Sequence, residues 1–592
     1  MGAIICLILA IVLCLGSYYL LLPTLSLGFF GGTFFTLFWI CVFAFAIGYL
    51  IYAFTDSEGF FLIAMGITIL SIVIIIIGSV ASSAIFHSVE KYQQIGKMEQ
   101  RSFKDDVLEI DTAQIPTVDI ELAKKVADKK LGEETALGSQ VKIGEFTNKQ
   151  QVAGKLVYVA PLEHRGLFKW LENKWGTPGY VVVSATNPND VKLVRKIGEK
   201  DLKLKYVNSA WFGDNLTRHI RNSGFRSIGL TEFSFELDDS GNPYWVVTTY
   251  KNTTVWGTPE ATGIVICNPQ TGECNWYSID EAPEWVDIIQ PEDFVKQQLR
   301  NYGRYVHGWW NPSEKDELTV TPHITTVYNE GKCYYYTGMS SSGADEGTVG
   351  FVLVNTRDKS VIYYKMAGAT EAAAMRSAEG KVQDMGYIAT EPIPLNISGV
   401  PAYFCTLKDS EGLIKAYAML KIEDYSIVAT GNSIMEAKRA FLNAVNMSGA
   451  GVDFGKGDNV FGYTIKGIIT RIGFNIESGE TYYYMILNDD ESKLYLASYT
   501  VSEELPISRE GDEVEIAYTD EANGTINIVS FDNVKFSQKI SQKQEELNKK
   551  QEAENLIQSE DTTITEVAPE KQQKKWEDLS DEEKAKLLEK LE

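Results

Sequence analysis

The sequence is poor in the residues on which most metal and acid-base centres depend. It has 5 histidines among 592 residues, and they are scattered along the chain as His87, His164, His219, His307 and His323. No two of them have the short spacing of a zinc-ligand pair, so we expect no metal site and no cofactor. Ligands from distant segments could still converge in the folded protein.

Two signatures of nucleophilic and nucleotide chemistry are also missing. Gly338, Ser340 and Gly343 have a superficial likeness to a nucleophile elbow, but their spacing differs and the flanking residues alternate as in antiparallel strands. No glycine-rich loop follows a strand and opens a helix, so nucleotide binding is unsupported. We therefore expect a protein that is not an enzyme, and no small-molecule substrate is evident.

Basic residues are in deficit. The sequence has 55 Lys and Arg but 79 Asp and Glu, which gives a net charge of −24. Because an acidic surface repels phosphate backbones, we do not expect a nucleic-acid partner. The N-terminus also lacks the basic residues and the small-residue cleavage site of a signal peptide. Its apolar segments are therefore expected to stay in the protein.

What the sequence has in excess is long apolar runs before residue 88. These runs predict transmembrane helices over 3–22, 29–54 and 60–86, separated by a Pro/Gly turn and by a short acidic loop. Residues 1–87 would form an integral membrane anchor, with the membrane as the first partner. Residues 88–116 are polar and mixed in charge, and we predict a helical linker there.

Two observations on the side of the membrane conflict. Four basic residues lie between positions 91 and 104, and the positive-inside rule would then place the soluble part in the cytoplasm. Cys267 and Cys274 flank a short turn, where a cross-strand disulfide would imply an oxidising compartment. Two reduced neighbouring thiols are the alternative. We favour an extracytoplasmic soluble part and keep the cytoplasmic placement open.

A hairpin pattern recurs through the soluble part. In residues 263–277 apolar β-formers enter a Pro/Gly turn and return through Cys274 and an aromatic pair, which predicts a β-hairpin. The pattern recurs at 179–194 and 350–364, and in degenerate form at 416–429. A period of roughly 80 residues predicts tandem small domains.

Each hairpin follows a predicted helix and at least one predicted strand. A helix laid across an antiparallel sheet buries one face of each, so this order predicts an α+β protein built of helix-on-sheet repeats. The predicted helices cover 121–132, 212–222, 291–300 and 369–383. The predicted repeats cover 117–200, 205–285, 290–366 and 367–447.

The order of these elements resembles PepSY domains. The resemblance is carried by the helix ELAKKVADKKLG at 121–132, the strand YWVVT at 244–248 and the hairpin IVICNPQTGECNWY at 264–277, and it extends over 117–447. It implies extracytoplasmic, non-catalytic modules associated with inhibition or regulation of cell-envelope proteins. The whole arrangement is also similar to a family of uncharacterised bacterial membrane proteins.

Residues 450–536 have a different character. Five short predicted strands resemble an OB-fold barrel, similar to the small β-barrel that ends NfeD-type membrane proteins. OB barrels often bind single-stranded nucleic acid through aromatic residues and basic grooves, but acidic residues outnumber basic ones here. Residues 537–592 form a charged tail whose last helix, after the capping residues Ser580 and Glu583, is predicted as a nascent helix in a disordered linker or as a docking helix.

Two aromatic inserts are the candidate contact surfaces. Trp170 and Trp175 lie in one insert, and Trp309 and Trp310 lie in the other. Such side chains either contact a protein or glycan partner or cover the core of a small domain. The sequence thus favours a membrane-anchored, non-enzymatic interaction or scaffold protein whose tandem domains meet protein partners at the cell envelope. The alternatives are a PepSY-type regulator or inhibitor of an envelope enzyme, and an envelope hydrolase.

Overall fold

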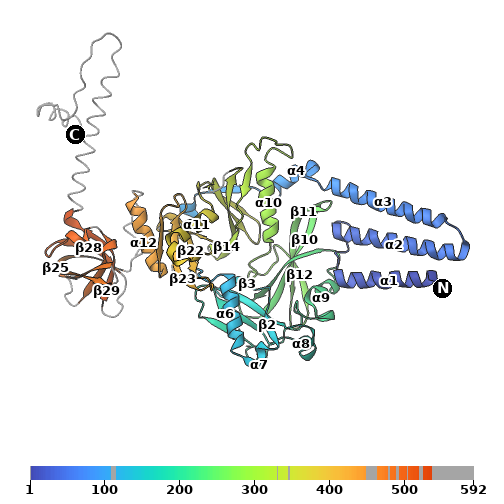
Figure 1. Ribbon diagram of the computed structural model, residues 1–592, viewed down its shortest axis with the longest axis horizontal. Coiled ribbons are helices and arrows are strands. Elements are labelled where there is room, and N and C mark those ends of the chain that lie inside the picture. The colour runs from blue at the N-terminus through green and yellow to red at the C-terminus, as the bar shows by residue number, and fades with distance from the viewer. Residues whose placement is uncertain are drawn as a thin grey trace, which may run out of the picture. The chain divides into compact units, whose positions relative to one another are not determined.

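The computed structural model describes residues 2–107, 115–329, 331–343, 347–448, 463–477, 480–488, 493–502, 504–518 and 525–536. It is a mixed α+β protein with apolar helices at its N-terminus, which confirms the predicted class (Figure 1). The chain divides into two compact units, Met1–Val452 and Asp453–Glu592. The helix predicted near Ser580 lies outside the described residues.

Three antiparallel helices form the N-terminal bundle: α1 (Gly2–Leu21), α2 (Phe30–Thr55) and α3 (Gly59–Ala81). Each is long and apolar enough to cross a membrane. The third predicted span was too long, because α3 ends at Ala81 rather than at residue 86. There Ser82 donates its hydroxyl to the carbonyl of Gly78 at 2.7 Å, and a separate helix, α4 (Ala84–Gln93), begins.

The first sheet follows helix α6 (Ile120–Gly132). Asp119 caps this helix, since its side chain accepts a hydrogen bond from the backbone N–H of Leu122 at 2.9 Å. The sheet has the order β2-β4-β5-β6, and β3 pairs with β4. Its strands are β2 (Val141–Ile143), β3 (Asn148–Val152), β4 (Lys155–His164), β5 (Tyr180–Ser184) and β6 (Val191–Val194), and the short elements α7 (Thr135–Gly138), α8 (Leu167–Glu172), β7 (Lys196–Ile197) and β8 (Lys200–Asp201) surround them.

The second sheet is an antiparallel meander with the order β12-β11-β10-β9. The 3-10 helix η2 (Phe212–Asp214) and helix α9 (Leu216–Asn222) precede it. Its strands are β9 (Gly229–Leu237), β10 (Pro243–Thr254), β11 (Gly257–Cys267) and β12 (Cys274–Ser278).

The third sheet contains a strand that the sequence did not predict. β1 (Met98–Arg101) lies in the segment expected to be a helical linker, yet it pairs in parallel with β18 (Val361–Tyr364). It covers a sheet edge that would otherwise leave backbone groups unpaired. Helix α10 (Glu292–Arg304) packs beside this sheet. The remaining elements are α5 (Phe103–Asp106), β13 (Leu318–Val320), β14 (Thr325–Asn329), β15 (Lys332–Ser341) and β17 (Gly350–Asn355), with the small pair β16 (Gly347–Thr348) and β19 (Gly368–Ala369) nearby.

The fourth sheet has the order β20-β22-β23-β24, and β21 pairs with β22. With it, each of the four predicted hairpins is present as a pair of adjacent antiparallel strands. The elements are α11 (Glu371–Lys381), β20 (Ile388–Ala389), β21 (Ile393–Ile397), β22 (Val400–Lys408), β23 (Ile414–Lys421), β24 (Val428–Gly431) and α12 (Ile434–Met447).

The second unit contains a closed five-stranded barrel with the order β25-β26-β27-β29-β28. β27 and β29 are parallel, whereas the other neighbours are antiparallel. The strands are β25 (Tyr463–Glu477), β26 (Glu480–Leu487), β27 (Leu494–Ser498), β28 (Glu513–Tyr518) and β29 (Thr525–Asn533).

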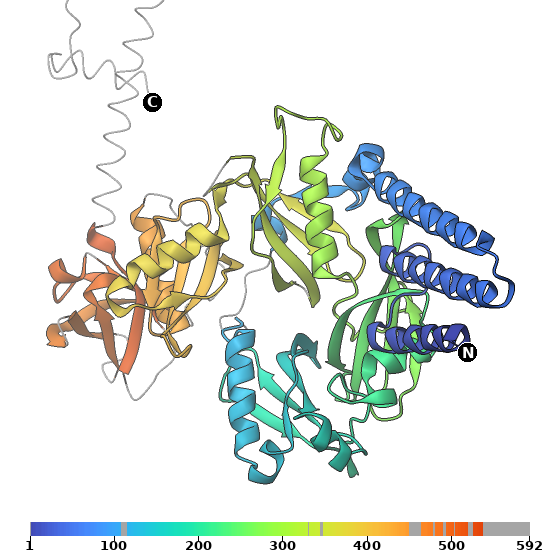
Figure 2. The ribbon, with the colours of Figure 1, turned by 45° about the vertical axis from the view of Figure 1, so that its right-hand side comes forward.

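The β10–β11 turn fixes the second sheet to the helical bundle. Trp256 donates its backbone N–H to the hydroxyl of Ser82 at 3.0 Å and its indole N–H to the carbonyl of Leu27 at 2.9 Å. Its ring lies against Gly78 of α3, where an added Cβ would come within 2.3 Å of the ring. This sheet therefore sits directly at the end of the bundle, as Figure 2 also shows.

Candidate functional site

A buried amide bridges the first and second sheets. Gln150 of β3 has 0% exposure. Its side chain donates to the backbone carbonyl of Leu237 at 3.2 Å and accepts from the N–H of the same residue at 3.1 Å. The amide hydrogen-bonds to the edge of β9 as a neighbouring strand would. The oxygen and nitrogen of the Gln150 side chain and the backbone N–H and carbonyl of Leu237 therefore all have partners.

A second set of polar contacts brings in the third sheet. The carboxylate of Asp287 accepts hydrogen bonds from the backbone N–H of Gln151 at 2.8 Å and from the hydroxyl of Tyr328 at 3.1 Å. The ammonium of Lys149 donates to the carbonyl of Thr326 at 3.0 Å. Burial raises the pKa of Asp287 and lowers the pKa of Lys149. These bonds hold β3 and β14 side by side.

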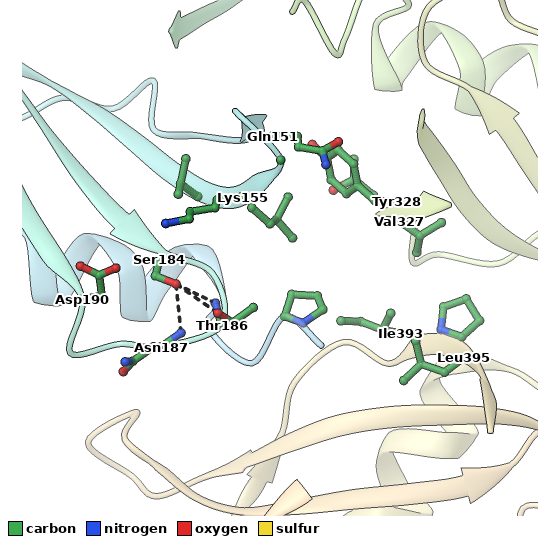
Figure 3. Close-up of a pocket in the computed structure, with 16 residues that line it drawn as sticks. Gln151, Lys155, Ser184, Thr186, Asn187, Asp190, Val327, Tyr328, Ile393 and Leu395 are labelled. Carbon is green, nitrogen blue, oxygen red and sulfur yellow. Dashed lines mark hydrogen bonds between the residues drawn. The ribbon is translucent and has the colours of Figure 1, made fainter. Parts of the chain in front are cut away.

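Beside this junction a cavity of about 530 Å³ opens between the first, third and fourth sheets (Figure 3). Its lining includes three successive residues of β14, 326–328, and three successive residues of β21, 393–395. Since successive side chains of a strand point to opposite faces, such a run presents the edge of the strand. Among the strands that the structure describes, β14 pairs only with β15 and β21 only with β22, so both are edge strands.

The opposite wall of the cavity comes from the first sheet and is more polar. The hydroxyl of Ser184 accepts hydrogen bonds from the backbone N–H groups of Thr186 and Asn187 at 3.3 and 3.2 Å, which fixes the turn after β5. Lys155 and Asp190 add one charge of each sign to this wall in Figure 3. The cavity combines strand edges, apolar side chains and a few charges. Sequence reasoning missed it because its walls come from separate repeats.

The structure brings the two predicted cysteines together. Cys267 and Cys274 are directly opposite each other on β11 and β12, and their Sγ atoms lie 2.6 Å apart. Both are free thiols here, Cys267 buried and Cys274 half-buried. Their proximity agrees with the sequence-based expectation, while the bond itself stays a prediction.

His219 of α9 completes a cluster with these thiols. Its Nε2 lies 2.7 Å from the carbonyl oxygen of Gly272, and its ring stacks on Tyr206 with centroids 3.9 Å apart. The ligand atoms of His219, Cys267 and Cys274 all lie within 4.8 Å of one another. The sequence treated His219 as isolated because the fold, rather than chain spacing, brings it here.

Within this cluster the pKa values of the two thiols are shifted in opposite directions. The hydrogen bond between the sulfurs lowers the pKa of Cys274 below that of an ordinary thiol, with a further contribution from His219. The same bond, together with burial, raises the pKa of Cys267. Two thiolates bound to one zinc ion stand about 3.7 Å apart, from Zn–S bonds of about 2.3 Å in a tetrahedron. The observed spacing therefore fits a disulfide better than a shared metal.

The four candidate contact tryptophans separate into two groups. Trp170 is 8% exposed and belongs to the core shared by the first and second sheets, so it covers a core. Trp175, Trp309 and Trp310 are 80%, 49% and 69% exposed. The last two contact each other with ring centroids 5.2 Å apart. Trp170 thus fits the core-covering alternative, whereas contact with a partner stays a prediction for the three exposed tryptophans.

One buried acid is a further feature that the sequence did not indicate. Glu236 of β9 has 0% exposure and accepts a hydrogen bond from the hydroxyl of Ser234 at 2.6 Å. Burial raises the pKa of Glu236 to about 8. It lies next to the junction residues Leu237 and Asp287, where it adds a group that titrates near neutral pH.

Comparison of the sequence with models of known protein families gives no match, and comparison with curated protein sequences gives none either. The resemblances to PepSY and NfeD-type domains therefore rest on the motifs quoted above. Any assignment of function has to come from the geometry of the described residues.

Proposed function

We propose that this chain is a membrane-anchored, non-enzymatic scaffold that binds an extended segment of a partner protein in the cavity between the first, third and fourth sheets. The observation that supports this proposal is the lining of the cavity by the edges of β14 and β21. An unpaired strand edge is a template for an added strand, and many peptide-recognition domains bind in this way. The edge of β21 offers such a template, whereas at β14 the carbonyl of Thr326 already accepts a hydrogen bond from Lys149.

The chemistry of the walls fits such a segment. Backbone groups at strand edges supply affinity for any extended chain, while apolar side chains such as Val327 and Leu395 select for alternate residues of the partner. Lys155 and Asp190 on the opposite wall offer charge contacts. The volume of about 530 Å³ lies within the range of ordinary ligand sites.

The proposal is tested by substituting one edge residue. In Ile393→Arg a charged side chain enters the cavity, whereas Ile388→Arg places the same change at an exposed position of the same sheet, outside the cavity lining. Cells that express each full-length variant are treated with a cross-linker, and adducts are quantified by mass spectrometry. We expect a protein adduct present in the wild type and in Ile388→Arg and lost in Ile393→Arg.

An unchanged set of adducts in Ile393→Arg would overturn the proposal. If the captured protein is an envelope enzyme whose activity changes when the chain is deleted, the scaffold acts as a regulator, which is the first alternative above.

We also propose that the four helix-on-sheet units are PepSY-like repeats and that the barrel is OB-like, of the NfeD type. The recurrence of a helix followed by an antiparallel sheet supports the first assignment. The strand order β25-β26-β27-β29-β28 supports the second, since OB folds are five-stranded Greek-key barrels.

We place the soluble part outside the cytoplasm. The juxtaposition of Cys267 and Cys274 supports this placement, because an oxidising compartment would bond sulfurs that lie this close. Intact cells are labelled with a membrane-impermeant maleimide after mild reduction, and the half-buried Cys274 is expected to react. Protection until permeabilisation, with no disulfide in the untreated protein, would move the soluble part to the cytoplasm.

A further inference from the structure

A group of exposed aromatic side chains lies beside the membrane exit of α1. Phe168 in α8 and Trp175 just after it are 77% and 80% exposed, while Trp211 and Phe212 at η2 are 45% and 56% exposed. These four residues are called the aromatic patch below. The rings of the buried Trp170 in α8 and of Phe212 lie 5.7 Å apart, so α8 and η2 are neighbours.

Arg218 connects the patch to the helical bundle. Its guanidinium donates to the backbone carbonyl of Phe212 at 2.9 Å and to that of Tyr19 in α1 at 3.1 Å. The guanidinium also lies 4.0 Å from the centre of the Tyr19 ring. Figures 1 and 2 both place α9, which carries Arg218, beside this end of α1. The side chain of Arg218 therefore connects the patch directly to the last turn of α1.

The length of α1 indicates where the surface of the membrane lies along the molecule. Its 20 residues span about 30 Å, which matches the thickness of the hydrocarbon core. Tyr19 then lies at the boundary between hydrocarbon and headgroups, where Tyr and Trp are enriched and where Arg meets lipid phosphates. The aromatic patch continues this boundary outward from the bundle.

The backbone of Phe212 in the patch also adopts a conformation of unfavourable energy. Phe212 has φ of 52°, which bulky side chains rarely adopt. Strain of this kind persists where the surroundings impose it, often at binding surfaces.

We propose that the aromatic patch lies in the headgroup layer of the bilayer, with Phe168, Trp175, Trp211 and Phe212 as interfacial side chains around α1. The partner of this surface is lipid, which distinguishes it from the protein-binding cavity. Nearby acidic groups do not oppose this contact, because Glu172 pairs with Lys169 and Asp214 with Lys205. The patch would restrain the first and second sheets against the membrane surface.

The full chain in lipid nanodiscs provides the test. The photoreactive residue p-benzoylphenylalanine is introduced at Trp175, at Phe212 or, as control, at Tyr425, which is 43% exposed in the fourth sheet. After irradiation we expect severalfold more phospholipid adduct from positions 175 and 212 than from position 425. Equal yields at all three positions, or protein adducts in place of lipid adducts in membranes of the native host, would overturn the proposal.

A second measurement needs no reactive residue and keeps the fold intact. Brominated phospholipid quenches tryptophan fluorescence only at short range, so nanodiscs with brominated and ordinary lipid are compared. We expect Trp175→Phe to remove a quenched component, whereas Trp285→Phe, whose ring stacks on Tyr244 in the second sheet, leaves it unchanged. An identical quenched fraction in both variants would contradict the placement of Trp175.

Discussion

Glu236 connects stability to pH at the scale of a single residue. Its pKa in the folded protein, about 8, lies above the ordinary value of 4.5, so folding favours the protonated carboxyl. The stabilising contribution of this proton is complete below pH 4.5 and is lost as pH rises through about 8. We therefore expect Glu236→Gln to raise the melting temperature of the nanodisc-embedded chain at pH 9 and to change it little at pH 4.

The control for this prediction is Glu199→Gln, on the exposed β7–β8 turn. Intrinsic fluorescence during heating measures both variants. A gain in melting temperature that is equal at pH 4 and pH 9 would show that the effect is packing rather than proton linkage.

The thiol cluster predicts unequal reactivity. In the fully reduced protein at pH 6.5, Cys274 is expected to react with iodoacetamide much faster than Cys267, because the pKa of Cys274 is lowered and that of Cys267 is raised. Mass spectrometry of the alkylated peptide measures the two rates. His219→Asn should slow Cys274, and equal rates in the wild type would refute the assigned asymmetry.

At the scale of elements, Gln150 joins two sheets through one amide. Gln150→Ala leaves the N–H and carbonyl of Leu237 buried without a partner, and we expect a loss of about 1–3 kcal/mol in the free energy of unfolding. Gln151→Ala is the matched control, since Gln151 contributes its backbone N–H to Asp287. Chemical unfolding of the full chain measures both, and equal losses would contradict the bridging role.

The contact between α3 and the β10–β11 turn gives a second prediction at this scale. In Gly78→Ala the new methyl group would meet the Trp256 ring, so we expect faster hydrogen exchange across the turn. In Gly66→Ala no atom lies within 4 Å of the new Cβ, and the change should be neutral or stabilise α3 by up to about 1 kcal/mol. Unchanged exchange in Gly78→Ala would show that the turn is not held by this contact.

The elements divide into those that local sequence specifies and those that it does not. The hairpin β11–β12 was predictable because turn residues and alternation lie within one short segment. The strand β1 was not, because its residues are polar and its partner β18 lies far along the chain. The His219 cluster and the cavity were missed for the same reason, since each needs segments that meet only in the folded chain.

At the scale of the whole molecule, the number of spans fixes which parts face each other across the bilayer. With α1, α2 and α3 crossing, the α2–α3 turn and the soluble sheets lie on opposite sides. An epitope tag after Ser57 and one after Glu199 should therefore show opposite protease sensitivity in sealed vesicles, and equal sensitivity once the vesicles are opened. Equal protection of the two tags in sealed vesicles would mean that one helix does not cross.

The parallel pairing of β1 with β18 also constrains how the chain can mature. A ribosome releases Met98–Arg101 soon after the anchor, yet the partner strand at Val361–Tyr364 emerges only after the first and second sheets have been made. The early strand must wait unpaired beside the membrane during this interval, and closure of such a long loop is slow. The third sheet is consequently completed only after the first and second sheets, and any fragment that starts after Arg101 lacks one of its strands.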